Sequence, residues 1–495
     1  MASLASLPDG RLPRAAVAAA LSLVLLPACT VGPDYTPPAP PVSTHYDREA
    51  ESRLASGGDR PGDQRIKLGE ALDGDWWTVF HSPRLNLTMR GAIDGNFDLK
   101  IADARIAQAS EAVRAAGGDL YPQVDWGAQI GRGRSNAPTP ATANFYAVGP
   151  RVSFDLDIFG GTKRLVEQQG ALADAQKHRF EAAYLTLTGD VASQAFLLAS
   201  ARAQSAAVRT LLADDERTLA LLRGAHMQGG IAQPDVALAE TQLAQDQTLL
   251  PPLAQQGDAA RHALAVLAGQ GPAEGVVPDF DLDDFTLPLD LPLSLPSEMA
   301  HDRPDLLEAE ADLRAASAAV GVATADLYPH LTLSGSLTQA GADPASVFQA
   351  GNSLWGVAAG LAGPLFHGGA LEANRRAAVD GYIAARATYQ RTVVRSLGQV
   401  ADVLQALGHD GDEYSAQERA LAAAATSLRL NRDGYRAGET GVLQVLDAER
   451  AYQRALLGQI RAKTARYLDT VQFFIALGGN ASGSYGRVAS ASKEP

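Results

Sequence analysis

Apolar and polar residues alternate one by one in two segments of the first half of the chain. Every even position is apolar and every odd position is polar or small at residues 124–130 and again at residues 148–158. Two segments of the second half repeat the pattern. A period of two directs successive side chains to opposite faces of a strand. The pattern therefore predicts four strands, two within about residues 121–158 and two within about residues 328–366.

Longer stretches around these segments repeat apolar residues with a period near 3.6, which is typical of helices. A shorter stretch precedes each strand pair, at residues 87–116 and 305–325. A longer one follows each pair, at residues 162–226 and 370–435. At about 1.5 Å per residue, the first long helix would span about 100 Å.

The chain is expected to reverse direction at glycine residues after each long helix. Gly229-Gly230 and Gly438 interrupt the helical pattern, which resumes at residues 236–268 and 442–477. The first returning stretch contains Pro251-Pro252, which predicts a less continuous helix because proline lacks a backbone donor. The sequence thus predicts two long helical hairpins.

The chain contains the same unit twice. The segment GGDLYPQV (residues 117–124) recurs as TADLYPHL (residues 324–331), and two further pairs of segments recur in the same order at a spacing of about 207 to 209 residues. Such order at one spacing indicates duplication of a unit of two strands and a long helix. Residues 81–268 and 304–478 are the expected copies, and residues 269–303 the connector between them.

The number of predicted strands indicates that one chain alone cannot form a complete membrane barrel. One face of the strands is apolar, and the other carries Arg151, Asp155 and Asp157. This pattern is typical of a membrane barrel with a polar lumen. A soluble sheet with one buried face would show a similar alternation. An open sheet of four strands would leave two unpaired edges in lipid, and the smallest membrane barrels have about eight strands. Strands in the membrane therefore require several copies sharing one barrel.

The N-terminal segment has the pattern of a secretory signal that ends at the only cysteine. Two arginines precede an apolar core at residues 15–26, and the letters LPAC end at Cys29. These letters resemble a bacterial lipobox, which predicts a signal peptide at residues 1–28 and an acylated Cys29. Thr30 favours the outer membrane over the inner one. The alternative is an ordinary signal with an incidental cysteine.

The composition argues against several classes of protein. The formal net charge is −14, which excludes a nucleic-acid partner on electrostatic grounds. The pairs Gly160-Gly161 and Gly368-Gly369 lack the Lys and Ser/Thr of a phosphate loop, and the histidines form no HExxH motif. The sequence therefore predicts no enzyme, no metal site and no cofactor, apart from the covalent lipid on Cys29.

Several short motifs carry a resemblance to a known family. They are CTVGPDY from Cys29, DLYP in both copies, DLDIFGG, GPLFHGG, and YRAGETGVLQVLDAER from Tyr435. Together they resemble the TolC-like outer-membrane efflux ducts, in particular the NodT-type lipoprotein branch. The resemblance implies a mainly α fold with a transmembrane β-barrel portion, in which three chains of four strands form a twelve-stranded barrel above a periplasmic α-helical tunnel. It also implies an equatorial region that includes the connector. Residues 29–80, proline-rich at residues 32–41, are expected to form a lipidated tether and the start of this region, and the Ser/Gly-rich residues 479–495 a flexible tail.

The resemblance also implies a gate at the periplasmic end of the tunnel. The matching residues are Leu443, Asp447 and Arg450, whose i, i+4 and i, i+3 spacings place them on one helix face. Around a threefold axis they would form an apolar ring and an acidic ring. Spacing alone favours the interpretation of Asp447 and Arg450 as a solvated surface pair worth about 0.3 to 0.5 kcal/mol, and only the resemblance favours the gate.

The partners implied by the resemblance are a periplasmic adaptor (membrane fusion protein) and an inner-membrane pump of the RND type. The hairpin tips would contact the adaptor through residues near the glycine turns, namely Arg223, Gly229, Gly230, Tyr435, Arg436 and Gly438. The implied function is a passive exit duct for small molecules. Two alternatives remain open: a duct for type I protein secretion, and a structural periplasmic lipoprotein without a channel.

Overall fold

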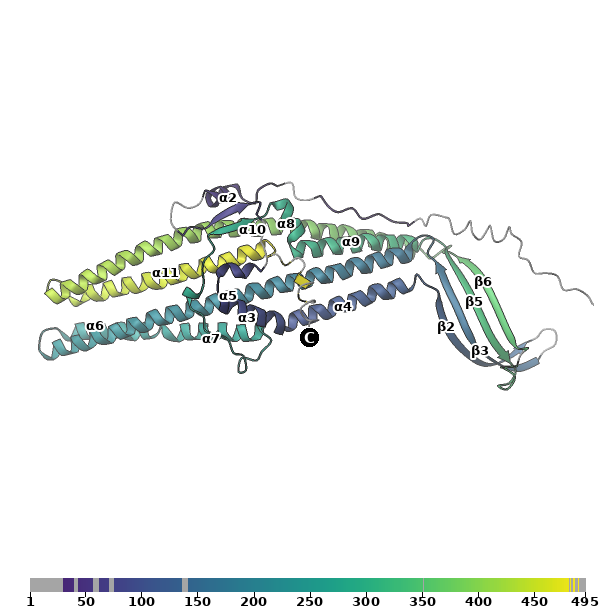
Figure 1. Ribbon diagram of the computed structural model, residues 1–495, viewed down its shortest axis with the longest axis horizontal. Helices are drawn as coiled ribbons and strands as arrows, with labels where there is room; N and C mark the ends of the chain where they lie inside the picture. Colours follow the sequence, from purple (N-terminus) through teal and green to yellow (C-terminus); the bar gives the residue numbers. More distant parts are fainter. Residues whose placement is uncertain are drawn as a thin grey trace, which may run out of the picture. The chain divides into compact units, whose positions relative to one another are not determined.

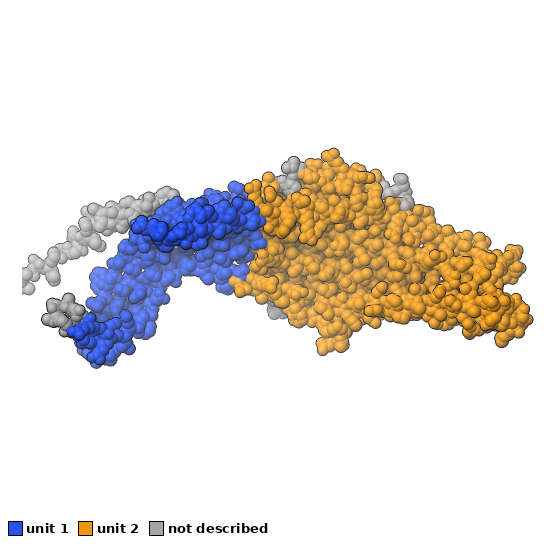
Figure 2. Space-filling view, turned by 180° about the vertical axis from the view of Figure 1, so that it is seen from behind, with its two compact units in different colours: residues 1–36, 109–173, 312–385 blue, residues 37–108, 174–311, 386–495 orange. Residues whose placement is uncertain are grey.

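The structure is a computed structural model that describes residues 30–39, 43–56, 62–70, 75–135, 141–349, 351–479, 481, 484–485 and 488. The predicted signal peptide and Cys29 lie outside the described residues, as does most of the predicted tail. The chain forms two compact units (Figure 2). Unit 1 comprises residues 1–36, 109–173 and 312–385, and unit 2 comprises residues 37–108, 174–311 and 386–495.

Unit 1 contains an antiparallel sheet of four strands in the order β2-β3-β5-β6 (Figure 1). The strands are β2 (Gln123–Ser135), β3 (Ala141–Leu156), β5 (His330–Gly341) and β6 (Ser353–Ala362). All four form where the alternation of apolar and polar residues predicts them. Because β3 pairs with β5, the two copies of the duplicated unit share one sheet.

The register places apolar side chains of neighbouring strands on one face. Val124 lies opposite Val152, and Leu337 lies opposite Trp355. On the other face, Arg151 has a polar partner in β5, Ser336. Six large apolar side chains of the first face stay between 68% and 79% exposed: Val124, Trp126, Ile130, Trp355, Val357 and Leu361. An apolar face this open indicates contact with lipid or with another chain.

The sheet of a single chain also has two free edges. In the described part of the chain, β2 and β6 each pair with a strand on one side only. The outer N–H and C=O groups of both strands are therefore left to another partner. Within lipid, where water cannot satisfy these groups, closure of the sheet into a barrel is required.

Helices account for most of the remaining described residues. They are α2 (Arg48–Ala55), α3 (Pro83–Gly95), α4 (Phe97–Gly118), α5 (Gly161–Met227), α6 (Gln233–Gln247), α7 (Leu250–Leu267), α8 (Pro296–Asp302), α9 (Pro304–Ala325), α10 (Ala370–Ala437) and α11 (Val442–Ala476). The long helices α5 and α10 match the predicted ones closely. The returning stretch of the first hairpin is interrupted between α6 and α7, just before Pro251-Pro252, as those prolines predict. Among the described helices, none is both long enough and apolar enough to cross a bilayer.

One helix predicted as continuous, at residues 87–116, is divided by Asn96. The backbone at Asn96 is extended, with a ψ of 132°. Its side-chain Oδ1 accepts hydrogen bonds from the N–H groups of Asp98 (2.8 Å) and Leu99 (3.1 Å), which caps α4. Its Nδ2 donates to the carbonyl oxygen of Leu267 (3.0 Å). The prediction of one helix was wrong here because asparagine is a favoured N-cap, and a tertiary contact fixes it in that role.

The connector between the copies contains a short strand that the sequence analysis did not predict. Within residues 269–303 lie the 3-10 helix η2 (Leu282–Asp284) and β4 (Asp290–Leu293). Strand β4 pairs in parallel with β1 (Arg65–Leu68). The carboxylate of Asp290 forms ion pairs with Arg65 and with Lys67, the latter at 3.3 Å. The N-terminal segment and the connector are thus joined in unit 2.

An aromatic core holds unit 2 together. Trp76 and Phe80 of the 3-10 helix η1 (Trp76–Phe80) are fully buried, as is Phe196 of α5. The ring of Phe196 lies 4.9 Å from that of Phe80 and 5.0 Å from that of Tyr467 in α11, measured between centroids. The indole of Trp76 donates a hydrogen bond to Thr188 Oγ1 at 3.2 Å. This core fixes α5 and α11 relative to each other.

Candidate functional site

Both helical hairpins of unit 2 turn at glycines. Gly229 follows the end of α5 with a φ of +76°, and Gly438 follows the end of α10 with a φ of +77°. The N–H of Gly230 donates to the carbonyl of Ala225 at 2.9 Å, which closes the last turn of α5. Glycine ends a helix in this way because it adopts positive φ without strain. The predicted breaks at these glycines are confirmed.

The predicted tip residues surround these turns. Arg223 of α5 forms an ion pair with Glu240 of α6 at 2.6 Å, and Arg436 forms one with Asp433 within α10 at 3.2 Å. The side chain of Tyr435 is partly exposed. A small apolar cluster joins α5, α6 and α11 near the turns: Leu219, Leu222, Val236, Ala239, Val442 and Leu446. The hairpin ends are therefore packed within the chain and carry charged groups at the surface.

Of the three predicted gate residues of α11, Leu443 and Asp447 are exposed, whereas Arg450 is mostly buried. Leu443 is 49% exposed, whereas Leu446 is buried in the apolar cluster. The carboxylate of Asp447 is largely exposed, and its Oδ1 lies 3.4 Å from Nη1 of Arg450. The guanidinium of Arg450 is two-thirds buried, and its Nε donates to Oε1 of Gln242 on α6. In the single chain, Arg450 therefore bridges the exposed Asp447 and a buried amide.

Gln242 connects Arg450 to two buried carboxyl groups. Its Nε2 donates to Oδ2 of Asp246, one turn further along α6, at 2.6 Å. The other oxygen of Asp246 accepts from Nε2 of Gln453 on α11 at 3.3 Å. Asp215 of α5 lies next to Asp246, and both carboxyl groups are only 5% exposed. The arrangement links α6 to α11 through amide side chains and places one acidic side chain of α5 beside one of α6.

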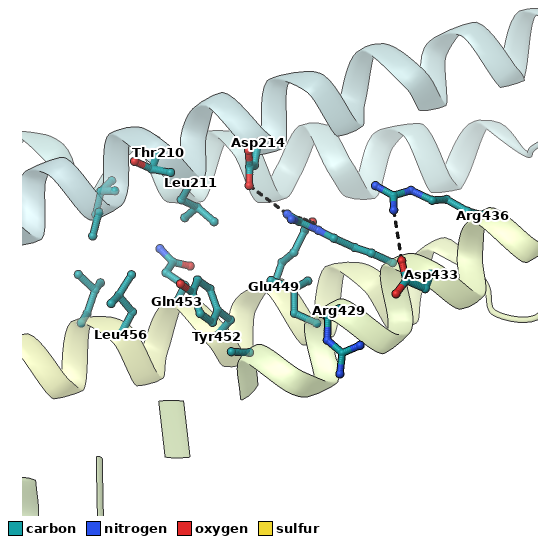
Figure 3. A pocket seen from close by; sticks show the side chains of 16 residues that line it. Thr210, Leu211, Asp214, Arg429, Asp433, Arg436, Glu449, Tyr452, Gln453 and Leu456 are labelled. Carbon is teal, nitrogen blue, oxygen red and sulfur yellow. Dashed lines mark hydrogen bonds and ion pairs between the residues drawn. The ribbon is translucent and has the colours of Figure 1, made fainter. Parts of the chain in front are cut away.

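A cavity of about 540 Å³ lies between α5, α10 and α11, and its lining includes Asp214, Asp433 and Glu449 (Figure 3). Nη2 of Arg432, on α10, lies 3.1 Å from Asp214 Oδ2 of α5 and 2.9 Å from Glu449 Oε1 of α11. Burial raises the pKa of Glu449, and the neighbouring Arg432 opposes that rise. These ion pairs connect the two hairpins next to the predicted gate residue Arg450.

The predicted lumenal residues divide into two groups. Arg151 and Asp155 lie within β3, and the carboxylate of Asp155 accepts a hydrogen bond from Thr332 Oγ1 of β5. Asp157 lies beyond the end of β3, and its carboxylate accepts from the N–H groups of Thr162 (3.0 Å) and Lys163 (2.8 Å). Asp157 therefore caps the start of α5 and does not belong to the polar face of the strand.

The residues that follow Cys29 are held against the start of α5 in unit 1. Thr30 packs so closely on Gly160 that a Cβ there would meet the Thr30 methyl group at 2.6 Å. Arg164 is buried, and its guanidinium donates to the Val31 carbonyl oxygen (3.2 Å) and to Asp34 Oδ1 (2.7 Å). A buried arginine with these partners fixes the first described residues at the corner between β3 and α5.

The buried polar residues near the predicted gate were not predicted. Asp215, Gln242 and Asp246 lie within the predicted helical stretches, where the helical period does not distinguish them from exposed polar residues. The one available signal was the i, i+4 spacing of Gln242 and Asp246, which places both side chains on the same face of α6. Whether that face is buried depends on α5 and α11, which the pattern of α6 alone does not reveal.

The chain matches a family model and several characterised proteins. The model described as "Outer membrane efflux protein" matches residues 89–270 and 295–479. The chain is 30% identical to outer membrane protein OprJ of Pseudomonas aeruginosa, over 95% of this chain and 96% of OprJ. It is 28% identical to the cation efflux system protein CusC of Escherichia coli (strain K12), over 92% and 97% of the two chains. It is 26% identical to nodulation protein T of Rhizobium leguminosarum, over 94% and 93%.

Solved structures share the fold. The outer-membrane channel OprN superposes with a TM-score of 0.83 at 28% identity, covering 91% of this chain and 99% of OprN. The open state of the MtrE outer membrane channel of Neisseria gonorrhoeae superposes with a TM-score of 0.79 at 26% identity, covering 92% and 99%. The matches span both copies of the duplicated unit, including the strands and the helical hairpins.

Proposed function

The chain belongs to the outer membrane efflux protein family, and on that premise we propose that it is the passive exit duct of a tripartite system that exports small molecules. Channels of this family work as trimers in the outer membrane, together with a periplasmic adaptor and an inner-membrane pump. The proposal also includes a lipid anchor, a gate, contacts with the adaptor and a pump of one type.

The open sheet of unit 1 carries the argument for a shared pore. A single chain supplies four strands with an exposed apolar face and two free edges. Three chains would supply twelve strands, which is within the range of membrane barrels and leaves no edge unpaired. The polar face with Arg151 and Asp155 would then line the water-filled lumen.

The lipid anchor on Cys29 is supported by the fixed position of the residues after it. Thr30 and Val31 are held at the strand-to-helix corner by Gly160 and Arg164. An acyl chain attached one residue earlier would therefore start close to the end of the barrel strands. Each buried CH₂ of such a chain contributes about 0.8 kcal/mol, so acylation adds to the hold of the barrel on the outer membrane.

The gate is assigned to Leu443, Asp447 and Arg450. Leu443 and Asp447 are exposed on α11 in the single chain, so a threefold axis nearby would gather three copies of each. Arg450 contacts Asp447 of its own chain, and in the proposed rings it would also pair with Asp447 of a neighbouring copy. The rings would narrow the tunnel until a partner protein moves the hairpins apart.

The adaptor contacts are assigned to the exposed hairpin ends. The charged side chains of Arg223 and Arg436 lie beside the glycine turns, and both are more than half exposed. Their ion pairs within the chain are worth about 0 to 1 kcal/mol, so an adaptor can replace them at little cost. An inner-membrane pump of the RND type completes the assembly, and the choice of substrate lies with that pump.

Deletion of the gene tests this function. A deletion strain is expected to become more sensitive to several compounds in a panel of drugs, dyes, solvents and metal salts, and a plasmid copy of the gene should restore resistance. A plasmid copy carrying Cys29→Ala tests the anchor separately. If no sensitivity changes while a secreted protein disappears from the medium, the chain serves type I secretion and the efflux proposal is wrong.

A further inference from the structure

Two buried acidic side chains face each other behind the gate with no base between them. Asp215 of α5 and Asp246 of α6 are each 5% exposed. Asp246 accepts hydrogen bonds from Gln242 and Gln453, but in the described part of the chain neither carboxyl oxygen of Asp215 has a donor. Two ionised carboxylates offer only acceptors to each other, whereas one shared proton would supply the missing donor.

The charged groups around the pair do not neutralise it. Asp214 on α5 and Glu449 on α11 add negative charge, and Arg432 of α10 is engaged by those two carboxylates. Arg450 of α11 is directed to Gln242 and Asp447. The pKa of Asp215 is raised to about 7, mainly because the carboxyl group is buried. The adjacent carboxyl of Asp246, together with Glu449 and Asp214, adds to that rise.

We propose that Asp215 and Asp246 share one proton that holds α5 against α6, and that loss of this proton releases the gate through Gln242 and Arg450. The shared proton bridges the two helices. Without it, two like charges lie side by side in a buried site and repel each other. The amide of Gln242 bonds to Asp246 on one side and to Arg450 on the other, so a displacement of Asp246 moves the partner of Arg450. This inference rests on the proposed gate.

The sign of the pH dependence follows from the raised pKa. The packed form holds the proton up to about pH 7, whereas a separated aspartate would lose it near pH 3.8. The packed form therefore binds more protons than the loosened form in this window, and its stability falls as the pH rises through it. Between pH 6 and 8, a group with a pKa of about 7 goes from about one-tenth to about nine-tenths deprotonated. The duct should open more readily at the higher pH.

Single-channel recording of the full acylated protein in planar bilayers tests the inference. The wild-type open probability is expected to rise about tenfold between pH 6 and 8. Asp215→Asn should abolish that rise and stay closed at pH 8, because its amide donates permanently to Asp246. A flat wild-type response, or a wild-type pH response retained by Asp215→Asn, would overturn the inference.

Asp410→Asn is the matched control. Asp410 on α10 is another buried carboxyl whose pKa is raised to about 7, by burial and by Asp469 of α11. Asp469 lies 19 residues beyond Arg450 on α11, which is about 28 Å along the helix. Asp410→Asn is expected to keep the wild-type response between pH 6 and 8. Loss of the response in this variant would show that the site behind the gate is not its source.

Two further measurements keep the outcome decisive. Should Asp215→Asn fail to fold, Asp246→Asn makes the same test from the other helix. In addition, the protection factors of the wild-type α6 amides, which are corrected for the intrinsic pH dependence of exchange, should fall as the pH rises. Asp447→Ala at constant pH separates this inference from the gate itself. If Asp447→Ala changes opening while both asparagine variants keep the wild-type pH response, the inference is wrong and the gate stands. If Asp447→Ala has no effect either, the gate is wrong and the inference falls with it.

Discussion

Asp447→Ala is expected to raise the open probability of the duct about tenfold in planar bilayers at constant pH. Within one chain, the carboxylate of Asp447 lies 3.4 Å from Arg450 on the same helix, and this pair is present whether the duct is open or closed. In the proposed rings each Asp447 would also pair with Arg450 of a neighbouring copy. Three exposed pairs of about 0.5 kcal/mol each sum to about 1.5 kcal/mol, which corresponds to roughly a tenfold change in the ratio of open to closed states. Without the carboxylates, three guanidinium groups would repel one another and push the α11 helices apart.

Asp433→Ala provides the control for the gate variant. Asp433 pairs with Arg436 at the same i, i+3 spacing and at 3.2 Å, but within α10. Its removal eliminates a similar ion pair without touching the proposed rings, and the open probability should stay within about twofold of the wild type. An unchanged conductance and open probability in Asp447→Ala would remove Asp447 from the gate.

Phe196→Ala is expected to destabilise unit 2 by about 3 to 5 kcal/mol, the usual cost of deleting a buried aromatic ring. Phe196 is fully buried, and its ring contacts Phe285 at 4.7 Å as well as Phe80 and Tyr467. The three contacted rings come from η1, α11 and the connector, whereas Phe196 belongs to α5. The cavity left by Phe196→Ala would therefore loosen several elements together. Loss of the helical circular dichroism signal of the detergent-solubilised protein should begin at a clearly lower temperature.

Phe196→Leu is the graded comparison for that variant. Leucine keeps much of the apolar volume but loses the edge-to-face and stacked ring contacts, so its cost should be about 1 to 2 kcal/mol. The unfolding temperatures should therefore rank in the order wild type, Phe196→Leu, Phe196→Ala. Equal unfolding temperatures for wild type and Phe196→Ala would contradict the assignment of this aromatic cluster as the core of unit 2.

Elements with a strong local period were predictable from the sequence. The strands of unit 1 follow from side chains that alternate between lipid-facing Val124 and polar neighbours such as Asp125, a pattern that needs no knowledge of the partner strand. The long helices and their ends follow from helical composition and from Gly229 and Gly438, where positive φ is required. These features are encoded within a few residues.

Features that depend on contacts between distant residues were not predictable. The division at Asn96 depends on Leu267, which is far away in the chain. The pairing of β1 with β4 joins two strands of only four residues each, too short to show a period. Asp215 and Asp246 form a buried pair because α5, α6 and α11 pack together around them. A single helical pattern records how polar a position is, but it does not record which residues cover it.

The mass of the purified protein in detergent tests the central claim, which is that one chain supplies only part of the pore wall. Extraction from the outer membrane should require detergent, and native mass spectrometry should give three chains per particle, because four strands with two free edges cannot close alone. A single chain that stays soluble without detergent after Cys29→Ala, with its sheet intact, would contradict the account.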